Sequence, residues 1–207
     1  MNLRLQMVEV CKKLHSGGLI AAGDGNVSYR LDKDLILITP GGVSKADIAP
    51  EEVAKTGMDA TLLEGPLKPS SEIRMHLLVY KMRPDVSAIV HAHPPIATAF
   101  TLAGLPFESK VLPEVWLMLG NVPVAPYATP ATEEVARAIE PHVPNSRAIL
   151  LERHGAVTFG QDLSQAWMRM EKLEHFARTL FHASMLRGRK APESLTQKQL
   201  LRLGVIG

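Results

Sequence analysis

The chain of 207 residues contains a single cysteine, Cys11, so no disulfide can form within it. It also lacks a strong excess of charge, because 23 Lys and Arg oppose 21 Asp and Glu for a formal net charge of +2. The one basic run, Arg187-Gly188-Arg189-Lys190, is short and typical of a solvated helix end. This balance gives no basis for nucleic acid as the main partner, which requires a basic surface.

Long hydrophobic runs are absent as well. No stretch approaches the 18 apolar residues of a membrane span, and Met1-Asn2-Leu3-Arg4 leads into an amphipathic segment instead of an apolar signal sequence. We therefore expect a cytoplasmic protein without a membrane partner. The hydrophobic content of 46% and the length fit one globular domain over 1–207, with a polar tail at 188–207 that is expected to be mobile.

Hydrophobic periodicity and turn residues predict an alternation of strands and helices. Ser70 or Ser71 is expected to cap a helix whose first turn holds Glu72. Strands early in the chain and helices interleaved later indicate one layered α/β or α+β structure. The expected strands cover 27–31, 35–39, 53–58, 61–63, 87–91, 122–125, 148–151 and 156–159, and the expected helices cover 3–18, 70–82, 96–102, 132–139 and 163–185.

The segment Ser87-Ala88-Ile89-Val90-His91-Ala92-His93 carries the most informative pattern. Side chains at i and i+2 of a strand share a face about 6–7 Å apart, so His91 and His93 can converge on one ion. His154 ends a second apolar run. A lone histidine usually satisfies a hydrogen bond in the core, but three together favour a metal. Three neutral ligands with one position left open are typical of a catalytic site.

A carboxylate and three small loops extend this pattern. Glu72 at a helix N-terminus tends to stay ionised, and could ligate the metal or act as a general base beside it. His76, one helical turn later, could touch the site, whereas the other histidines are expected to be ordinary. The loops at Gly25-Asn26, Gly41-Gly42 and Ser70-Ser71 offer backbone N–H groups and hydroxyls for a phosphate. A divalent cation there would stabilise an enediolate, which suits retro-aldol cleavage of a sugar phosphate.

Five motifs occur in the order and spacing of a known family. They are Gly25-Asn26-Val27-Ser28, Ile38-Thr39-Pro40-Gly41-Gly42, Ser70-Ser71-Glu72, His91-Ala92-His93 and Arg153-His154-Gly155. The chain resembles the class II aldolase/adducin-head family, most closely its L-fuculose-1-phosphate aldolase branch. The resemblance implies a three-layer α/β/α fold, in which helices flank a central, mostly antiparallel sheet. It also implies a fourfold-symmetric homotetramer with active sites between subunits.

The same resemblance implies a zinc enzyme that cleaves a ketose 1-phosphate, such as L-fuculose 1-phosphate, to dihydroxyacetone phosphate and an aldehyde. His91, His93 and His154 would be the metal ligands, and Mn²⁺ or Co²⁺ would also suit them. Glu72 would be the acid/base, and also a ligand when no substrate is bound. The phosphate would be held by Asn26, Gly42, Ser70 and Ser71, with Gly41 in place of a threonine often found there.

The chain departs from the aldolases in two places. It has no tyrosine at 107–114 and none at 187–207, where the family's aldolases carry one. The proton donor to the leaving alkoxide is therefore unassigned, with Glu114 and Tyr127 as candidates. Dehydratases and decarboxylases of the family, which keep the three histidines, are the main alternative. A 4-epimerase would carry Asp at position 72, an adducin-like binding module would have lost ligands, and a metal-dependent hydrolase would use Glu72 to activate water.

Overall fold

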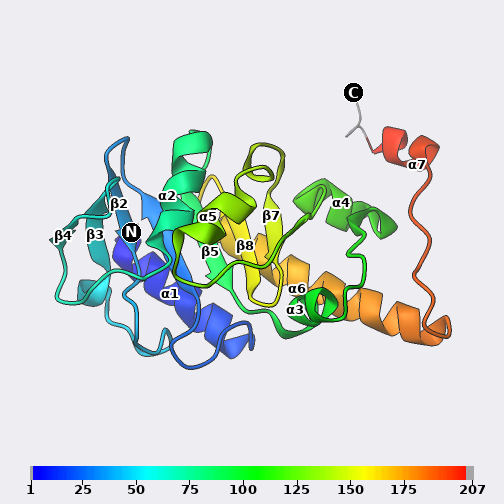
Figure 1. Ribbon diagram of the computed structural model, residues 1–207, viewed down its shortest axis with the longest axis horizontal. Helices are drawn as coiled ribbons and strands as arrows, with labels where there is room; N and C mark the ends of the chain where they lie inside the picture. The colour runs from blue at the N-terminus through cyan, green and yellow to red at the C-terminus, as the bar shows by residue number, and fades with distance from the viewer. Residues whose placement is uncertain (1, 204–207) are drawn as a thin grey trace.

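The computed structural model describes residues 2–203 and contains one eight-stranded sheet flanked by helices (Figure 1). The strand order is β4-β3-β2-β1-β5-β8-β7-β6, and every neighbouring pair is antiparallel except β6 with β7. The expected mostly antiparallel α/β architecture is thus confirmed. The strands are β1 (Asn26–Arg30), β2 (Leu35–Ile38), β3 (Ala54–Gly57), β4 (Leu62–Glu64), β5 (Ala88–Ala92), β6 (Val124–Ala125), β7 (Ala148–Leu151) and β8 (Gly155–Gly160).

Helices cover both faces of the sheet. One core joins the sheet to α1, α3, α4 and α6, and the other joins it to α2 and α5. Among the described residues, none of the helices is both long and apolar enough to cross a membrane. The helices are α1 (Leu3–Ser16), α2 (Ile73–Met82), α3 (Pro95–Leu102), α4 (Pro113–Leu119), α5 (Glu133–Ile139), α6 (Leu163–Leu186) and α7 (Gln197–Arg202).

Strand β5 lies near the middle of the sheet and is buried on both faces. Its side chains alternate, as a pleated strand requires. Ala88, Val90 and Ala92 belong to the core beneath α1 and α6, whereas Ile89 belongs to the core beneath α2. His91 shares the parity of Ile89, so its imidazole faces the α2 side. Strand pleating therefore assigns His91 to the face on which α2 packs.

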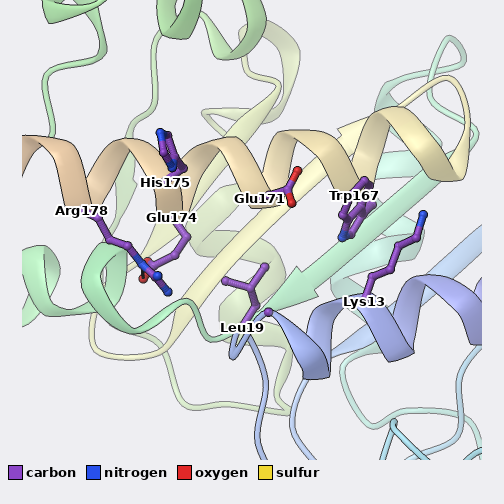
Figure 2. A pocket seen from close by; sticks show the side chains of 8 residues that line it. Lys13, Leu19, Trp167, Glu171, Glu174, His175 and Arg178 are labelled. Atoms are coloured by element: carbon purple, nitrogen blue, oxygen red, sulfur yellow. Dashed lines mark hydrogen bonds and ion pairs between the residues drawn. The ribbon is translucent and has the colours of Figure 1, made fainter.

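The long helix α6 anchors the chain immediately after His93. Its buried Glu174 accepts hydrogen bonds from the backbone N–H groups of Ile96 and Ala97, 3.0–3.2 Å away at the start of α3. Figure 2 shows Glu174 and Arg178 on α6, beside a pocket between α6 and α1. On the α1 side of that pocket, the Lys13 Nζ lies 4.4 Å from the centroid of the Trp167 ring. A carboxylate at a helix N-terminus satisfies its free donors and fixes the turn that follows His93.

Two local expectations differ from the structure. Helix α2 begins at Ile73, so Glu72 is its N-cap residue and makes no side-chain cap bond. The cause is upstream: Ser70 N–H donates to the Thr39 carbonyl (3.1 Å), and Pro40 bridges to Pro69. These bonds hold the serines against the end of β2, so the helix starts later than the sequence pattern predicts. Helix α4 was not predicted.

Part of the tail packs against the rest of the chain. It forms α7, and the Leu195 N–H donates to the Lys110 carbonyl at 2.9 Å. Leu200 is buried. These contacts hold the described part of the tail beside the segment that precedes α4.

Candidate active site

The antiparallel pairing of β5 with β8 brings the three predicted histidines together. Ala92 pairs with Ala156, so the β7–β8 turn that carries His154 lies beside the end of β5. His93 is the first residue after that strand. The ring centroids are 4.8–5.1 Å apart, and one nitrogen from each ring lies within 4.8 Å of the others. Residues 63 positions apart in sequence thus form one cluster of potential metal ligands.

The turn before His154 has an unusual backbone. Arg153 has φ +58°, in the left-handed region that side chains disfavour, and its N–H donates to the Thr101 hydroxyl at 3.1 Å. At Gly155, a Cβ atom would come within 2.8 Å of His93 Cδ2 and closer still to the Ala92 carbonyl oxygen. A residue without a side chain is therefore needed for His154 to approach His93.

Hydrogen bonds orient the rings toward a common centre. His91 Nδ1 lies 3.0 Å from the Ala156 carbonyl, which can only accept, so this nitrogen carries a proton and Nε2 is the nitrogen that would bind a metal. His93 Nδ1 contacts the Asp24 carboxylate at 3.3 Å, and its Nε2 lies 3.2 Å from His91 Nε2. Burial, aided by the charge of His91, lowers the pKa of His93 to about 4, so the ring is neutral near pH 7.

Glu72 enters the same centre from the start of α2. Its Oε2 lies 3.0 Å from His91 Nε2 and its Oε1 lies 3.2 Å from His154 Nε2. Burial by itself raises the pKa of Glu72, but attraction to His91 and hydrogen bonds with His154 and His91 outweigh it, so the pKa falls well below its usual range. Glu72 is therefore an ionised carboxylate at the centre of the cluster.

This donor set fits a divalent cation. Glu72 Oε1 is buried, and the polar group beside it is a nitrogen of the same cluster, His154 Nε2, at 3.2 Å. The Nε2 atoms of His91 and His93 face one another across 3.2 Å, although a neutral ring has only one proton to share between its two nitrogens. An anionic oxygen and three imidazole nitrogens that converge in this way are the ligand types that bind zinc.

A buried chain of hydrogen bonds runs along one face of α2, from Glu72 to Tyr80 near the end of the helix. Asn26 Nδ2 donates to Glu72 Oε2 at 3.0 Å, so Asn26 Oδ1 accepts from His76 Nε2 at 2.5 Å. His76 Nδ1 must then accept from the Ser28 hydroxyl (2.6 Å), which in turn accepts from the Tyr80 hydroxyl (2.7 Å). Burial, reinforced by His91, lowers the pKa of His76 to about 3. The chain therefore holds a neutral His76 with one defined proton position.

Only part of this network could be predicted from the sequence. The expectation that His76 could touch the site is met indirectly, through Asn26. Ser28 and Tyr80 were not singled out. The available signal was spacing: Asn26 and Ser28 alternate along one strand, whereas Glu72, His76 and Tyr80 recur every four residues along the helix.

The five residues predicted for the phosphate line one small pocket of about 210 Å³ beside the histidine cluster. The bond from Ser70 N–H to the Thr39 carbonyl and that from Gly41 N–H to the Lys68 carbonyl (3.2 Å) bring the loop at 40–42 against residues 68–71. Gly42 has φ +72°, which favours glycine there. The pocket is lined by Asn26, Gly41, Gly42, Ser70 and Ser71 together with Glu72, His93 and His154.

Four further residues have surroundings that the sequence did not indicate. The side-chain amide of Asn26 is engaged by Glu72 and His76. Glu114 on α4 and Tyr127 after β6 are exposed, and neither is among the residues that line the pocket. Lys45 lines the pocket but was not among the predicted site residues.

Comparison with known proteins gives consistent matches. The family described as "Class II Aldolase and Adducin N-terminal domain" matches residues 5–181. A 5-deoxy-D-ribulose 1-phosphate aldolase of Bacillus thuringiensis is 33% identical over 185 residues, covering 88% of this chain and 86% of the relative. A 3-oxo-tetronate 4-phosphate decarboxylase of Escherichia coli is 32% identical over 184 residues, covering 87% and 86%. An L-fuculose phosphate aldolase of Methanococcus maripaludis is 30% identical over 172 residues, covering 83% and 92%.

Solved structures give the same result. The crystal structure of YgbL, titled a putative aldolase/epimerase/decarboxylase from Escherichia coli, superposes with a TM-score of 0.88 at 30% identity and covers 97% of each chain. An L-fuculose 1-phosphate aldolase also has a TM-score of 0.88, at 29% identity, with 97% of this chain and 93% of that one covered. Since the family match spans most of the sequence and relatives exceed 30% identity over most of both chains, the chain belongs to the class II aldolase and adducin N-terminal domain family.

Proposed function

We propose that the protein is a metal-dependent aldolase that cleaves a ketose 1-phosphate, such as L-fuculose 1-phosphate, to dihydroxyacetone phosphate and an aldehyde. One observation carries the proposal: three histidine nitrogens and the ionised Glu72 converge beside a pocket lined by Gly42, Ser70 and Ser71. A cation and a phosphate pocket so close together are what cleavage of a small sugar phosphate requires.

His91, His93 and His154 would hold the metal through Nε2. Zinc suits three imidazoles, and Mn²⁺ or Co²⁺ would also bind them. With three neutral ligands, a bound divalent cation supplies nearly its full charge to stabilise the negative charge that develops on the substrate during C–C cleavage.

Residues of this chain would bind the phosphate and transfer the proton at C3. The loop at 40–42 and Ser70-Ser71 bind the phosphate through backbone N–H groups and hydroxyls, which fixes C1 to C3 of the substrate near Glu72. When the C3–C4 bond breaks, the C4 hydroxyl gives up its proton and C3 must gain one. The Glu72 carboxylate takes up the proton released into the site and delivers it to C3, and it removes that proton from C3 in the reverse direction. His76 holds Asn26, and Asn26 orients Glu72 Oε2 toward the cluster.

Decarboxylation of a 3-oxo-tetronate 4-phosphate is the second candidate. Relatives named for that activity are 32–34% identical to this chain. The sequence also favours it in one respect, because residues 107–114 and 187–207 contain no tyrosine. Loss of CO₂ from a 3-oxo acid leaves the same kind of charge on the substrate but needs no residue to take the proton from a C4 hydroxyl, or to return it in the condensation direction.

Other activities of the scaffold have less support. An epimerase would carry Asp where Glu72 stands. A family dehydratase would keep the three histidines, as this chain does, but none of the relatives reported above is named for that activity. A non-catalytic adducin-like module would not need all three histidines. A metal-dependent hydrolase would need no enolisable substrate.

The deciding experiment follows metal-loaded protein with dihydroxyacetone phosphate in deuterated water by NMR, with and without lactaldehyde or acetaldehyde. An aldolase loses a C3 proton signal and forms a ketose phosphate when aldehyde is added, and the aldehyde that reacts identifies the substrate. Neither exchange nor condensation, together with CO₂ release from a 3-oxo-tetronate 4-phosphate, would replace the aldolase with the decarboxylase.

We also propose that the protein is a single-domain cytoplasmic enzyme that assembles as a homotetramer, with each pocket completed by a neighbouring subunit. The family resemblance supports this assembly, and Glu114 and Tyr127 are exposed and outside the pocket of their own chain. Sedimentation equilibrium tests it, and a monomer of 22.6 kDa with full activity would contradict it.

A further inference from the structure

Lys45 is the only lysine or arginine side chain that lines the proposed phosphate pocket in the described chain. It is 1% exposed, an unusual position for a lysine, since this side chain is almost never fully buried unless it is paired. It follows the loop at 40–42 by three residues and lies outside every motif on which the family resemblance rests.

The Lys45 ammonium joins two loops of the site. Its Nζ donates to the Gly23 carbonyl at 3.0 Å and to the Val43 carbonyl at 2.8 Å. Gly23 begins the turn that leads to Asn26, and Val43 follows Gly42. An ammonium has three N–H donors, and within residues 2–203 no acceptor is bonded to the third.

The positive charge of Lys45 has no counter-ion in direct contact among residues 2–203. No carboxylate of residues 2–203 forms an ion pair with it. Two groups act on it electrostatically, Cys11 and Asp24. Burial raises the pKa of the Cys11 thiol to about 12, so Cys11 is uncharged. Asp24 attracts Lys45 without pairing with it, and its half-exposed carboxylate contacts His93 Nδ1 at 3.3 Å instead.

An ammonium buried without a counter-ion is unfavourable, and burial accordingly lowers the pKa of Lys45. A dianionic phosphate beside it would supply the missing charge and accept from the free N–H. The neutral amides and hydroxyls of the pocket can orient a phosphate but cannot neutralise it.

We propose that Lys45 is the cation of the phosphate site, where it ties the Gly23 loop to the Gly42 loop and supplies the positive charge that attracts the substrate phosphate. It is a positioning and binding residue, distant from the bond that breaks. The inference rests on the proposed sugar-phosphate function, although its test reads phosphate binding separately from turnover.

Two variants separate the positive charge of Lys45 from its hydrogen bonds to the Gly23 and Val43 carbonyls. Lys45→Met removes both, whereas Lys45→Gln removes the charge and keeps an amide that can donate to the two carbonyls. Lys68→Met is the matched control, because Lys68 is exposed and its backbone borders the same loop. Zinc content, gel filtration and circular dichroism establish that each protein is folded and loaded.

The first probe is inorganic phosphate, titrated by calorimetry into the zinc-loaded proteins. We expect both Lys45 variants to bind it about tenfold or more weakly, since a charge-assisted hydrogen bond is lost, and Lys68→Met to match wild type. With dihydroxyacetone phosphate, the KM for C3 proton exchange should rise more than kcat falls. Wild-type affinity in Lys45→Met, or in Lys45→Gln alone, would overturn the role of the charge.

A measurement on the wild type covers the case in which both variants fail to fold. The 15Nζ resonance of Lys45 in labelled protein should shift as inorganic phosphate saturates, and an unchanged resonance would refute the contact. If phosphate binding depends on Lys45 but the protein does not exchange the C3 proton, the aldolase proposal is refuted and the role of Lys45 is supported. C3 proton exchange that is unchanged in the Lys45 variants would support the aldolase and refute the role of Lys45.

Discussion

His76 should make the folded state sensitive to mild acid. The ring is fully buried, its Nε2–H donates to Asn26, and its Nδ1 accepts from Ser28, so a second proton would break a bond and charge a buried ring. The pKa of His76 is therefore about 3 in the folded protein, against 6.5 for an ordinary histidine.

The direction in which stability changes with pH follows from which state, folded or unfolded, binds the proton at the higher pH. Above pH 6.5 neither state is protonated at this residue and its contribution is constant. Below pH 6.5 His76 is protonated in the unfolded chain, whereas in the native chain it stays neutral down to about pH 3. The free energy of unfolding therefore falls as the pH is lowered. At about 1.4 kcal/mol per pH unit, lowering the pH from 8 to 5 removes about 2 kcal/mol.

The test compares urea unfolding of the wild type and His76→Gln at pH 8 and pH 5, followed by circular dichroism. A chelator is present throughout, so that release of metal does not enter the comparison. His76→Gln should be less stable at pH 8, because its network is altered, yet should lose about 2 kcal/mol less than wild type on acidification. His175→Gln, at an exposed position on α6, serves as the control and should follow wild type. Equal losses in wild type and His76→Gln would refute the assignment of a neutral, proton-refusing His76.

The remaining predictions concern the centre and the pocket. His93→Ala should lose stoichiometric zinc and turnover while the fold persists, as measured by metal analysis and circular dichroism; retained zinc would exclude His93 as a ligand. Glu72→Gln should keep its metal but slow C3 proton exchange by about 100-fold or more, and exchange at the wild-type rate would mean that Glu72 is not the base. Gly155→Ala should lower both the free energy of unfolding, by about 1–3 kcal/mol, and the zinc affinity, because the added Cβ meets His93 and the Ala92 carbonyl. The double variant Ser71→Ala, Gly42→Val should bind dihydroxyacetone phosphate weakly while retaining zinc, and unchanged binding would contradict the phosphate assignment.

Much of the fold could be predicted, because strand alternation and helical periodicity are local properties. The pattern at Ala88 to His91 sufficed to place a buried strand, and the turn residues around Gly155 sufficed to place the next hairpin. The start of α2 could not be predicted, since Ser70 is held by Thr39, a residue 31 positions earlier. Local capping preference favoured a helix there, and a tertiary hydrogen bond prevented it.

The candidate site, like the fold, could be predicted from the sequence only in part. The histidines were identifiable because metal ligands are chemically distinctive in sequence. Lys45 was not, because a lysine is normally solvated. His76 was indicated only as a residue that could touch the site, because a helical histidine is normally unremarkable. Each gains its meaning from burial, which depends on how α1, β1 and α2 pack.

Cys11 gives the protein a natural probe of its own opening. It is fully buried on α1 with a thiol pKa of about 12, and no other thiol exists in the chain. A thiol-reactive dye can therefore label the protein only when α1 separates from the sheet. When reclosing is fast, the labelling rate reports the free energy of that opening, and each 1.4 kcal/mol slows labelling by about tenfold. Ligands that bind only the closed form would be detected as slower labelling, without any knowledge of the substrate.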